Sequence, residues 1–63
     1  MNANYHEPKF QPGEKVMVGE YPFNREGTIA AFGPFKEGEH NYFVSTNLGE
    51  VCYPERLVER IAP

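Results

Sequence analysis

The chain has 63 residues and a formal net charge of −3, with six lysines and arginines against nine acidic residues. This length allows one domain at most, and because no stretch is basic, the charge argues against the cationic face that nucleic-acid binding requires. No apolar run approaches the roughly 20 residues of a membrane-spanning helix, and the N-terminus lacks the basic and apolar regions of a signal peptide.

The N-terminal end is expected to be a tail rather than part of the folded domain. Residues 1–11 are polar and show no period, so we expect a flexible tail that docks locally through Phe10. Pro12-Gly13 is a turn signal, because proline fixes φ and glycine admits positive φ. The domain is therefore predicted to span residues 12–63.

The rest of the chain consists of short β segments separated by turn signals, which is typical of an all-β fold. The strands are predicted at residues 14–18, 27–32, 41–45, 50–53 and 58–61. The connections are predicted as loops at 19–26 and 33–40, a three-residue hairpin at 47–49 with Gly49 in the left-handed conformation, and a helical turn at 54–57. This order predicts a five-stranded SH3-like barrel with one short helical turn before the last strand.

Aromatic residues exceed what so small a core can hold. The chain has four tyrosines and five phenylalanines. The core is predicted to contain Val16, Val18, Ile29, Ala31, Val44, Leu57 and Ile61, with Tyr42 and Cys52 as further candidates. Strand alternation then sets Phe43 on the face opposite Tyr42, and sets Val51 and Tyr53 on the face opposite Cys52. Because exposed apolar patches usually mark a contact surface, the predicted interface comprises Tyr21, Phe23, Phe35, Phe43, Val51 and Tyr53.

Two alternatives to this interface stay open. The loop aromatics are also suited to fold back and cap the ends of a barrel. In addition, a shift of one residue in the strand around Val51 would exchange the faces of Val51 and Cys52 and move Tyr53 inside.

The reactive side chains form no pattern of a catalytic or metal site. Cys52 is the single cysteine, so it cannot form a disulfide within the chain, and no histidine is near it in sequence. His6 and His40 do not have zinc spacing, and both are expected to be solvated. We therefore expect no catalytic residue, no metal and no cofactor. The lone thiol and the missing signal peptide favour a reducing cytoplasm.

Several segments resemble the plasmid-borne type II dihydrofolate reductases, which are SH3-like barrels that assemble as tetramers around a central pore. The segments are Phe10–Val16, Gly27-Thr28-Ile29, Tyr42-Phe43-Val44, and Tyr53-Pro54 followed by Val58–Ile61. That family lines its pore with a Val-Gln-Ile-Tyr stretch, whose glutamine and tyrosine hold the ligands, and attracts their charge with a lysine on the first strand. Here Tyr53 matches the tyrosine, but Val51 replaces the glutamine and no lysine follows Val16. The resemblance implies the fold, without the groups that carry the reductase chemistry.

Residues 20–30 resemble the first long loop and second strand of the photosystem I accessory subunit that helps to dock ferredoxin. That family presents basic residues to an acidic partner, whereas this chain is acidic. The likeness therefore implies a shared barrel architecture.

The sequence predicts a non-enzymatic SH3-like interaction module that forms a homo-oligomer. Self-association explains the surplus aromatics and the small core together, and closed symmetric oligomers are the common form. One alternative is a divergent reductase-like protein that binds a small ligand in an oligomer pore lined by Val51 and Tyr53. The other is an adaptor that docks a peptide or protein, in which Tyr21, Tyr53 and Pro54 imitate an aromatic groove.

Overall fold

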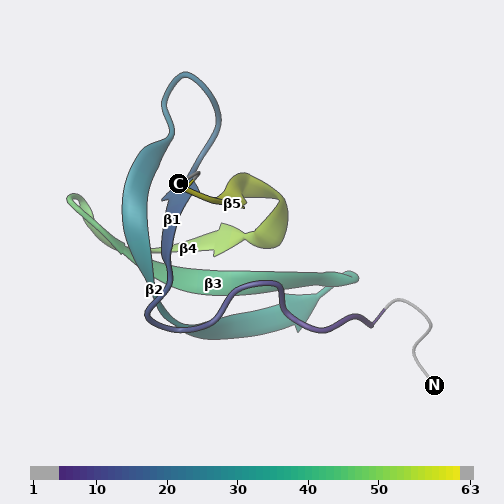
Figure 1. Cartoon of the computed structure of the whole chain (residues 1–63). Helices are drawn as coiled ribbons and strands as arrows, with labels where there is room; N and C mark the ends of the chain where they lie inside the picture. Colours follow the sequence, from purple (N-terminus) through teal and green to yellow (C-terminus); the bar gives the residue numbers. More distant parts are fainter. Residues whose placement is uncertain (1–4, 62–63) are drawn as a thin grey trace.

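Antiparallel strands make up most of the chain in the computed structural model, which describes residues 5–61 (Figure 1). In chain order, the elements are β1 (Lys15–Val18), β2 (Arg25–Lys36), β3 (Glu39–Thr46), β4 (Gly49–Pro54), the 3-10 turn η1 (Glu55–Leu57) and β5 (Val58–Arg60). The all-β class and the single helical turn before the last strand are as predicted. Within the described residues there is no helix of the length and apolarity needed to cross a membrane.

The strands form one five-stranded sheet in the order β4-β3-β2-β1-β5, which is bent but open. The predicted closure into a barrel is wrong, because β4 and β5 do not pair in the part of the chain that the structure describes. β5 pairs with β1 along all three of its residues, and β4 pairs with β3. Within residues 5–61, one edge of β4 and one edge of β5 therefore stay without a strand partner.

The predicted loop at 33–40 is also wrong, because most of it is strand. β2 continues to Lys36, and the chain reverses within the two residues Glu37 and Gly38. Both residues have positive φ, 54° and 76°, which is the backbone conformation of a tight hairpin turn. Pro34 lies in an irregular stretch between the paired residues Phe32 and Phe35, where a missing N–H is tolerated.

A second irregularity in β2 changes which residues face the core. Ile29 pairs with Val44 and Ala31 pairs with Phe43, so β2 contains one extra residue between these two pairs. Such a bulge reverses the alternation of side chains beyond it. Ala31, predicted in the core, is therefore exposed.

The core is small and close to the prediction. It consists of Phe10, Val16, Val18, Ile29, Tyr42, Val44 and Val58. Of the other predicted members, Leu57 is half-buried, and Cys52 and Ile61 are exposed. Val58 is buried because it pairs with Val18. Phe10 comes from the predicted tail, and its ring packs edge-on against that of Tyr42 at 5.6 Å between centroids.

The N-terminal segment runs alongside the β2–β3 hairpin (Figure 1). Of the predicted tail, residues 1–4 lie outside the described residues. The turn before β4 is one residue shorter than the predicted hairpin at 47–49, because Asn47 and Leu48 form it and Gly49 begins β4 paired with Thr46. Gly49 has the predicted positive φ, +102°.

Candidate functional site

Two of the predicted contact residues project from the loop between β1 and β2. The side chains of Tyr21 and Phe23 are 89% and 78% exposed, and the loop extends away from the sheet (Figure 1). Its base is held by a hydrogen bond from the backbone N–H of Gly19 to the carbonyl of Leu57, 2.9 Å. Within the loop, the backbone N–H of Phe23 donates to the carbonyl of Glu20 at 2.7 Å. These two aromatics therefore do not cap the end of the sheet.

Phe35 lies elsewhere, at the end of β2 next to the tight turn. It is half-buried, and its ring contacts those of Tyr5 and His40, with centroid distances of 5.2 and 4.6 Å. The structure therefore does not bring Phe35 together with the aromatics of the projecting loop.

The register of β4 corrects the predicted face of Val51 and Tyr53. Val51 pairs with Val44 and Tyr53 pairs with Tyr42, so both lie on the core side of the sheet. Phe43 pairs with Cys52 on the opposite face. The register between β3 and β4 therefore differs by one residue from the predicted register. The tight turn fixes it, because a hairpin's loop length sets which residues lie opposite.

β4 nevertheless remains accessible on both faces. No further strand pairs with it among residues 5–61, and its first four residues, from Gly49 to Cys52, are exposed. Val51 is 37% exposed although its neighbour Val44 is fully buried. We call Phe43, Val51, Cys52 and Tyr53 the β4 surface. It contains three of the predicted interface residues, with Val51 and Tyr53 on one face of the sheet and Phe43 on the other, and adds Cys52.

A buried carboxylate near the N-terminal segment was not predicted. Glu55 begins η1 and is only 7% exposed. One oxygen, Oε2, accepts hydrogen bonds from the Tyr42 hydroxyl at 2.5 Å and from the backbone N–H of Lys9 at 3.2 Å. The other, Oε1, accepts one from Nε2 of His6 at 3.0 Å. This cluster ties the N-terminal segment to β3 and η1.

The protonation states of this cluster follow from burial and hydrogen bonding. Burial alone raises the pKa of Glu55, but the hydrogen bonds from Tyr42, His6 and Lys9 outweigh it, and the pKa is lowered from its ordinary value. Burial, reinforced by the hydrogen bond to Glu55, raises the pKa of Tyr42 to about 12. At neutral pH the pair is an anionic carboxylate and a neutral phenol. Each is engaged with neighbours of the same chain, so their role is to hold the fold.

His40 differs from the expectation of a solvated side chain. It is only 8% exposed, and its Nε2 donates a hydrogen bond to the carbonyl of His6 at 2.5 Å. The two imidazole rings are 5.0 Å apart between centroids. Even so, the described residues contain no group of three or more potential ligands arranged to hold a metal ion.

Two open clefts flank the N-terminal segment. The larger, about 580 Å³, is polar and is bordered by His6, Lys9, Glu55 and the ion pair between Arg56 and Glu39. The smaller, about 320 Å³, is mainly apolar, and it is bordered by Tyr5, Pro8, Phe32, Gly33, Phe35 and His40. Charges of both signs border the larger cleft, so it favours no class of charged ligand.

Neither a protein-family model nor a curated protein matches this sequence.

Proposed function

We propose that this chain is a non-enzymatic interaction module of the SH3-like kind that associates with copies of itself through the β4 surface. The observation that carries the proposal is that β4 is an edge strand with exposed apolar side chains on both faces. The strand order and the single 3-10 turn before β5 support the SH3-like assignment.

The chemistry of β4 favours a second copy as its partner. An edge strand has unpaired N–H and C=O groups, which an antiparallel copy of the same strand satisfies about a two-fold axis. With the axis at Cys52, Val51 of one copy lies opposite Tyr53 of the other. Glu50 then lies opposite Pro54, so the strand's one charged residue does not meet its own copy. Added apolar contact also compensates for the small core.

The other described edge is poorly suited to the same role. β5 is three residues long and carries two charged side chains, Glu59 and Arg60, both exposed. Charges on a short edge strand discourage pairing with foreign strands. Of the two edge strands, the longer and more apolar β4 is therefore the one suited to pair with a second copy.

The reductase-like alternative places Val51 and Tyr53 in an oligomer pore. Val51 has no hydrogen-bonding group, so the side chain at the position of the family's glutamine offers a pterin or nicotinamide only apolar contact. We also infer a cytoplasmic location, because Cys52 is an exposed free thiol and such thiols persist in reducing compartments.

The test is the solution mass by light scattering over a range of concentrations. We expect the intact chain to form a dimer or larger closed oligomer, and Val51→Lys to weaken its association about tenfold or more, since a lysine deters edge pairing and enters the interface twice. Tyr21→Lys is the control, because it places the same charge on an exposed site outside β4. A monomer at every concentration would contradict the proposal.

Ligand titration separates the alternatives. An oligomer that binds dihydrofolate or a nicotinamide dinucleotide would favour the reductase-like protein. An oligomer that binds neither supports the interaction module. Circular dichroism of Val51→Lys reports whether the variant is folded, and Cys52→Lys replaces it if it is not.

A further inference from the structure

The N-terminal segment has a firmly held part and a superficial part. The backbone N–H groups of Lys9 and Phe10 donate to the Tyr42 hydroxyl at 3.0 and 3.3 Å, and Arg60 donates to the carbonyl of Lys9 at 2.7 Å. The side chain of Phe10 is only 4% exposed. Residues 9–10 are therefore an anchor that belongs to the core.

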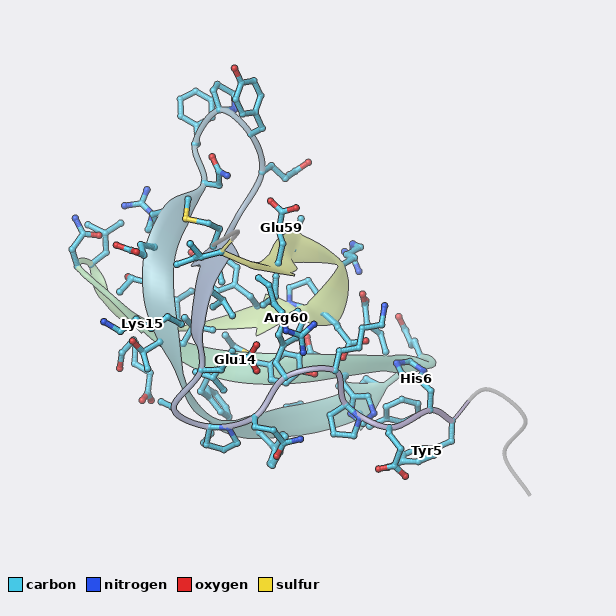
Figure 2. The ribbon with its side chains drawn as sticks, in the orientation of Figure 1. Tyr5, His6, Glu14, Lys15, Glu59 and Arg60 are labelled. Carbon is cyan, nitrogen blue, oxygen red and sulfur yellow. The ribbon has the colours of Figure 1, made fainter. Side chains whose placement is uncertain are left out.

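Residues 5–8, which we call the strap, have few such contacts. Tyr5 is 54% exposed, and its ring lies against Phe35 and His40 (Figure 2 shows Tyr5 and His6 beside the end of the hairpin). The strap's hydrogen bonds to the domain are those of His6, from its ring to Glu55 and from His40 to its carbonyl. These contacts are separate from those that the anchor makes with Tyr42 and Arg60.

The surface beneath the strap is an aromatic cleft that the strap only partly fills. Phe32 remains 47% exposed, and about 320 Å³ stays open between the strap and the hairpin. Its floor is formed by Phe32 and Phe35, with Gly33 between them. A substitution at Gly33 is disfavoured, because a Cβ there would lie 3.1 Å from the carbonyl oxygen of Asn41.

We propose that this cleft is a binding site for an extended peptide with an aromatic residue three positions before a proline, and that the strap occupies it in cis. The strap has this pattern, with Tyr5 and Pro8 both at the cleft. The aromatic ring of the ligand stacks against Phe35 and His40, its proline faces Phe32, and His40 Nε2 donates to a backbone carbonyl. Aromatic grooves are a general solution for binding extended proline-containing segments.

The strap lowers the affinity for such a peptide, because the competent state is the one with the strap released. The apparent dissociation constant increases by the inverse of that state's population. The β4 surface is not involved, so this site does not depend on self-association.

The test uses the full chain and a fluorescein-labelled peptide with the sequence of residues 5–9, with binding followed by fluorescence anisotropy. Tyr5→Ala combined with His6→Ala opens the strap, and we expect this variant to bind the peptide at least about tenfold more tightly than the intact chain. Phe35→Ser in the opened variant removes the floor and is expected to abolish binding. The matched control, Tyr21→Ala, is expected to leave the affinity of the intact chain unchanged.

Equal affinity of the intact and opened chains, or binding that survives Phe35→Ser, would overturn the proposal. If the opened variant does not fold, the intact chain is titrated with excess peptide while the ring NMR signals of Tyr5 are followed. Displacement moves these signals to the positions of a solvated tyrosine. Signals that stay in place at millimolar peptide would refute the site equally well.

Discussion

At the scale of single residues, Glu55 is a buried carboxylate that several parts of the chain share. Its carboxylate accepts hydrogen bonds from Tyr42, His6 and the backbone of Lys9. Replacement by alanine leaves the phenol and the backbone N–H without their acceptor, and a buried donor that loses its partner costs about 1–3 kcal/mol. The N-terminal segment would lose two of its attachments at the same time, those of His6 and of the Lys9 backbone to Glu55.

We therefore predict that Glu55→Ala lowers the free energy of unfolding by about 2–3 kcal/mol, measured by urea denaturation. The control is Glu59→Ala, which removes an exposed carboxylate from β5 and is expected to change stability by less than about 0.5 kcal/mol. Equal effects of the two substitutions would show that the buried hydrogen bonds contribute little.

The pair formed by Glu55 and Tyr42 predicts how the free energy of unfolding depends on pH. The folded pKa of Glu55 is below its unfolded value, so its contribution is present above the unfolded pKa and is lost as pH falls through the folded one. The folded pKa of Tyr42 is raised from 10.0 to about 12, so its contribution is complete below pH 10 and is lost between 10 and 12. We expect the alkaline decrease to disappear in Tyr42→Phe when unfolding free energies are measured across this range. A decrease of the same size in that variant would assign it to other groups.

The residue pattern alone was enough to predict part of the core. Val16 and Val18 lie two residues apart in one strand, as Tyr42 and Val44 do in another, and all four are fully buried. His6 and Glu55 carry no such signal, because they are separated by 49 residues and meet through the path of the N-terminal segment. A charged side chain so far from its partner in sequence is most simply interpreted as solvated.

At the scale of elements, β2 shows where alternation fails as a guide. Gly33, Pro34 and Gly38 are turn residues by composition, yet the first two lie within a strand of 12 residues. The bulge around Ala30 then reverses the phase. Both features are set by pairing with β3, which a local pattern does not contain. The positive φ at Gly49 was predictable, because it depends on the residue type and its position in the turn rather than on distant contacts.

A close approach between β2 and β3 gives a prediction for Gly27. A Cβ at this position would lie 2.6 Å from Cγ1 of Val44 and 2.9 Å from the carbonyl oxygen of Ser45. Because Val44 is packed in the core and the carbonyl belongs to the backbone, neither moves freely. We expect Gly27→Ala to cost about 1–3 kcal/mol, which for a domain of this size lowers the thermal midpoint by at least about 4 °C. The control is Ala31→Ser, which changes an exposed residue of the same strand. An unchanged thermal midpoint for Gly27→Ala would mean that β2 and β3 move apart at this position without cost.

At the scale of the whole molecule, the open sheet determines which surfaces are available. The sequence order of strands and turns was sufficient to predict an all-β chain with five strands, but not the missing closure, since closure requires pairing between strands that a local pattern does not contain. The predicted interface was likewise divided by the fold. Tyr21 and Phe23 project from a loop, and Phe35 contacts Tyr5. Phe43 lies on β3, and Val51 and Tyr53 lie on β4.

The two-fold pairing of β4 makes a prediction that a solution mass does not test. Opposed residues in an antiparallel pair have Cα atoms about 4.5–5.5 Å apart, which is within the range of about 4.4–6.8 Å that disulfides span. With the axis at Cys52, the exposed thiols of two copies are opposed. Mild oxidation with diamide is therefore expected to link the copies covalently, and Val51→Lys is expected to slow the reaction in step with its weaker association.

Random collision between exposed thiols is the competing explanation for such a cross-link. The control chain combines Cys52→Ser with Leu48→Cys, which moves the thiol to the exposed turn before β4, where Leu48 is 67% exposed. Non-reducing electrophoresis compares the rates of dimer formation at equal concentration. A faster reaction through Cys52 than through the turn requires that the thiols be held together, and this supports edge pairing in that register. Equal rates would contradict edge pairing with the two-fold axis at Cys52. The assemblies then left are those in which β4 contacts its copy through a face of the sheet rather than through its edge.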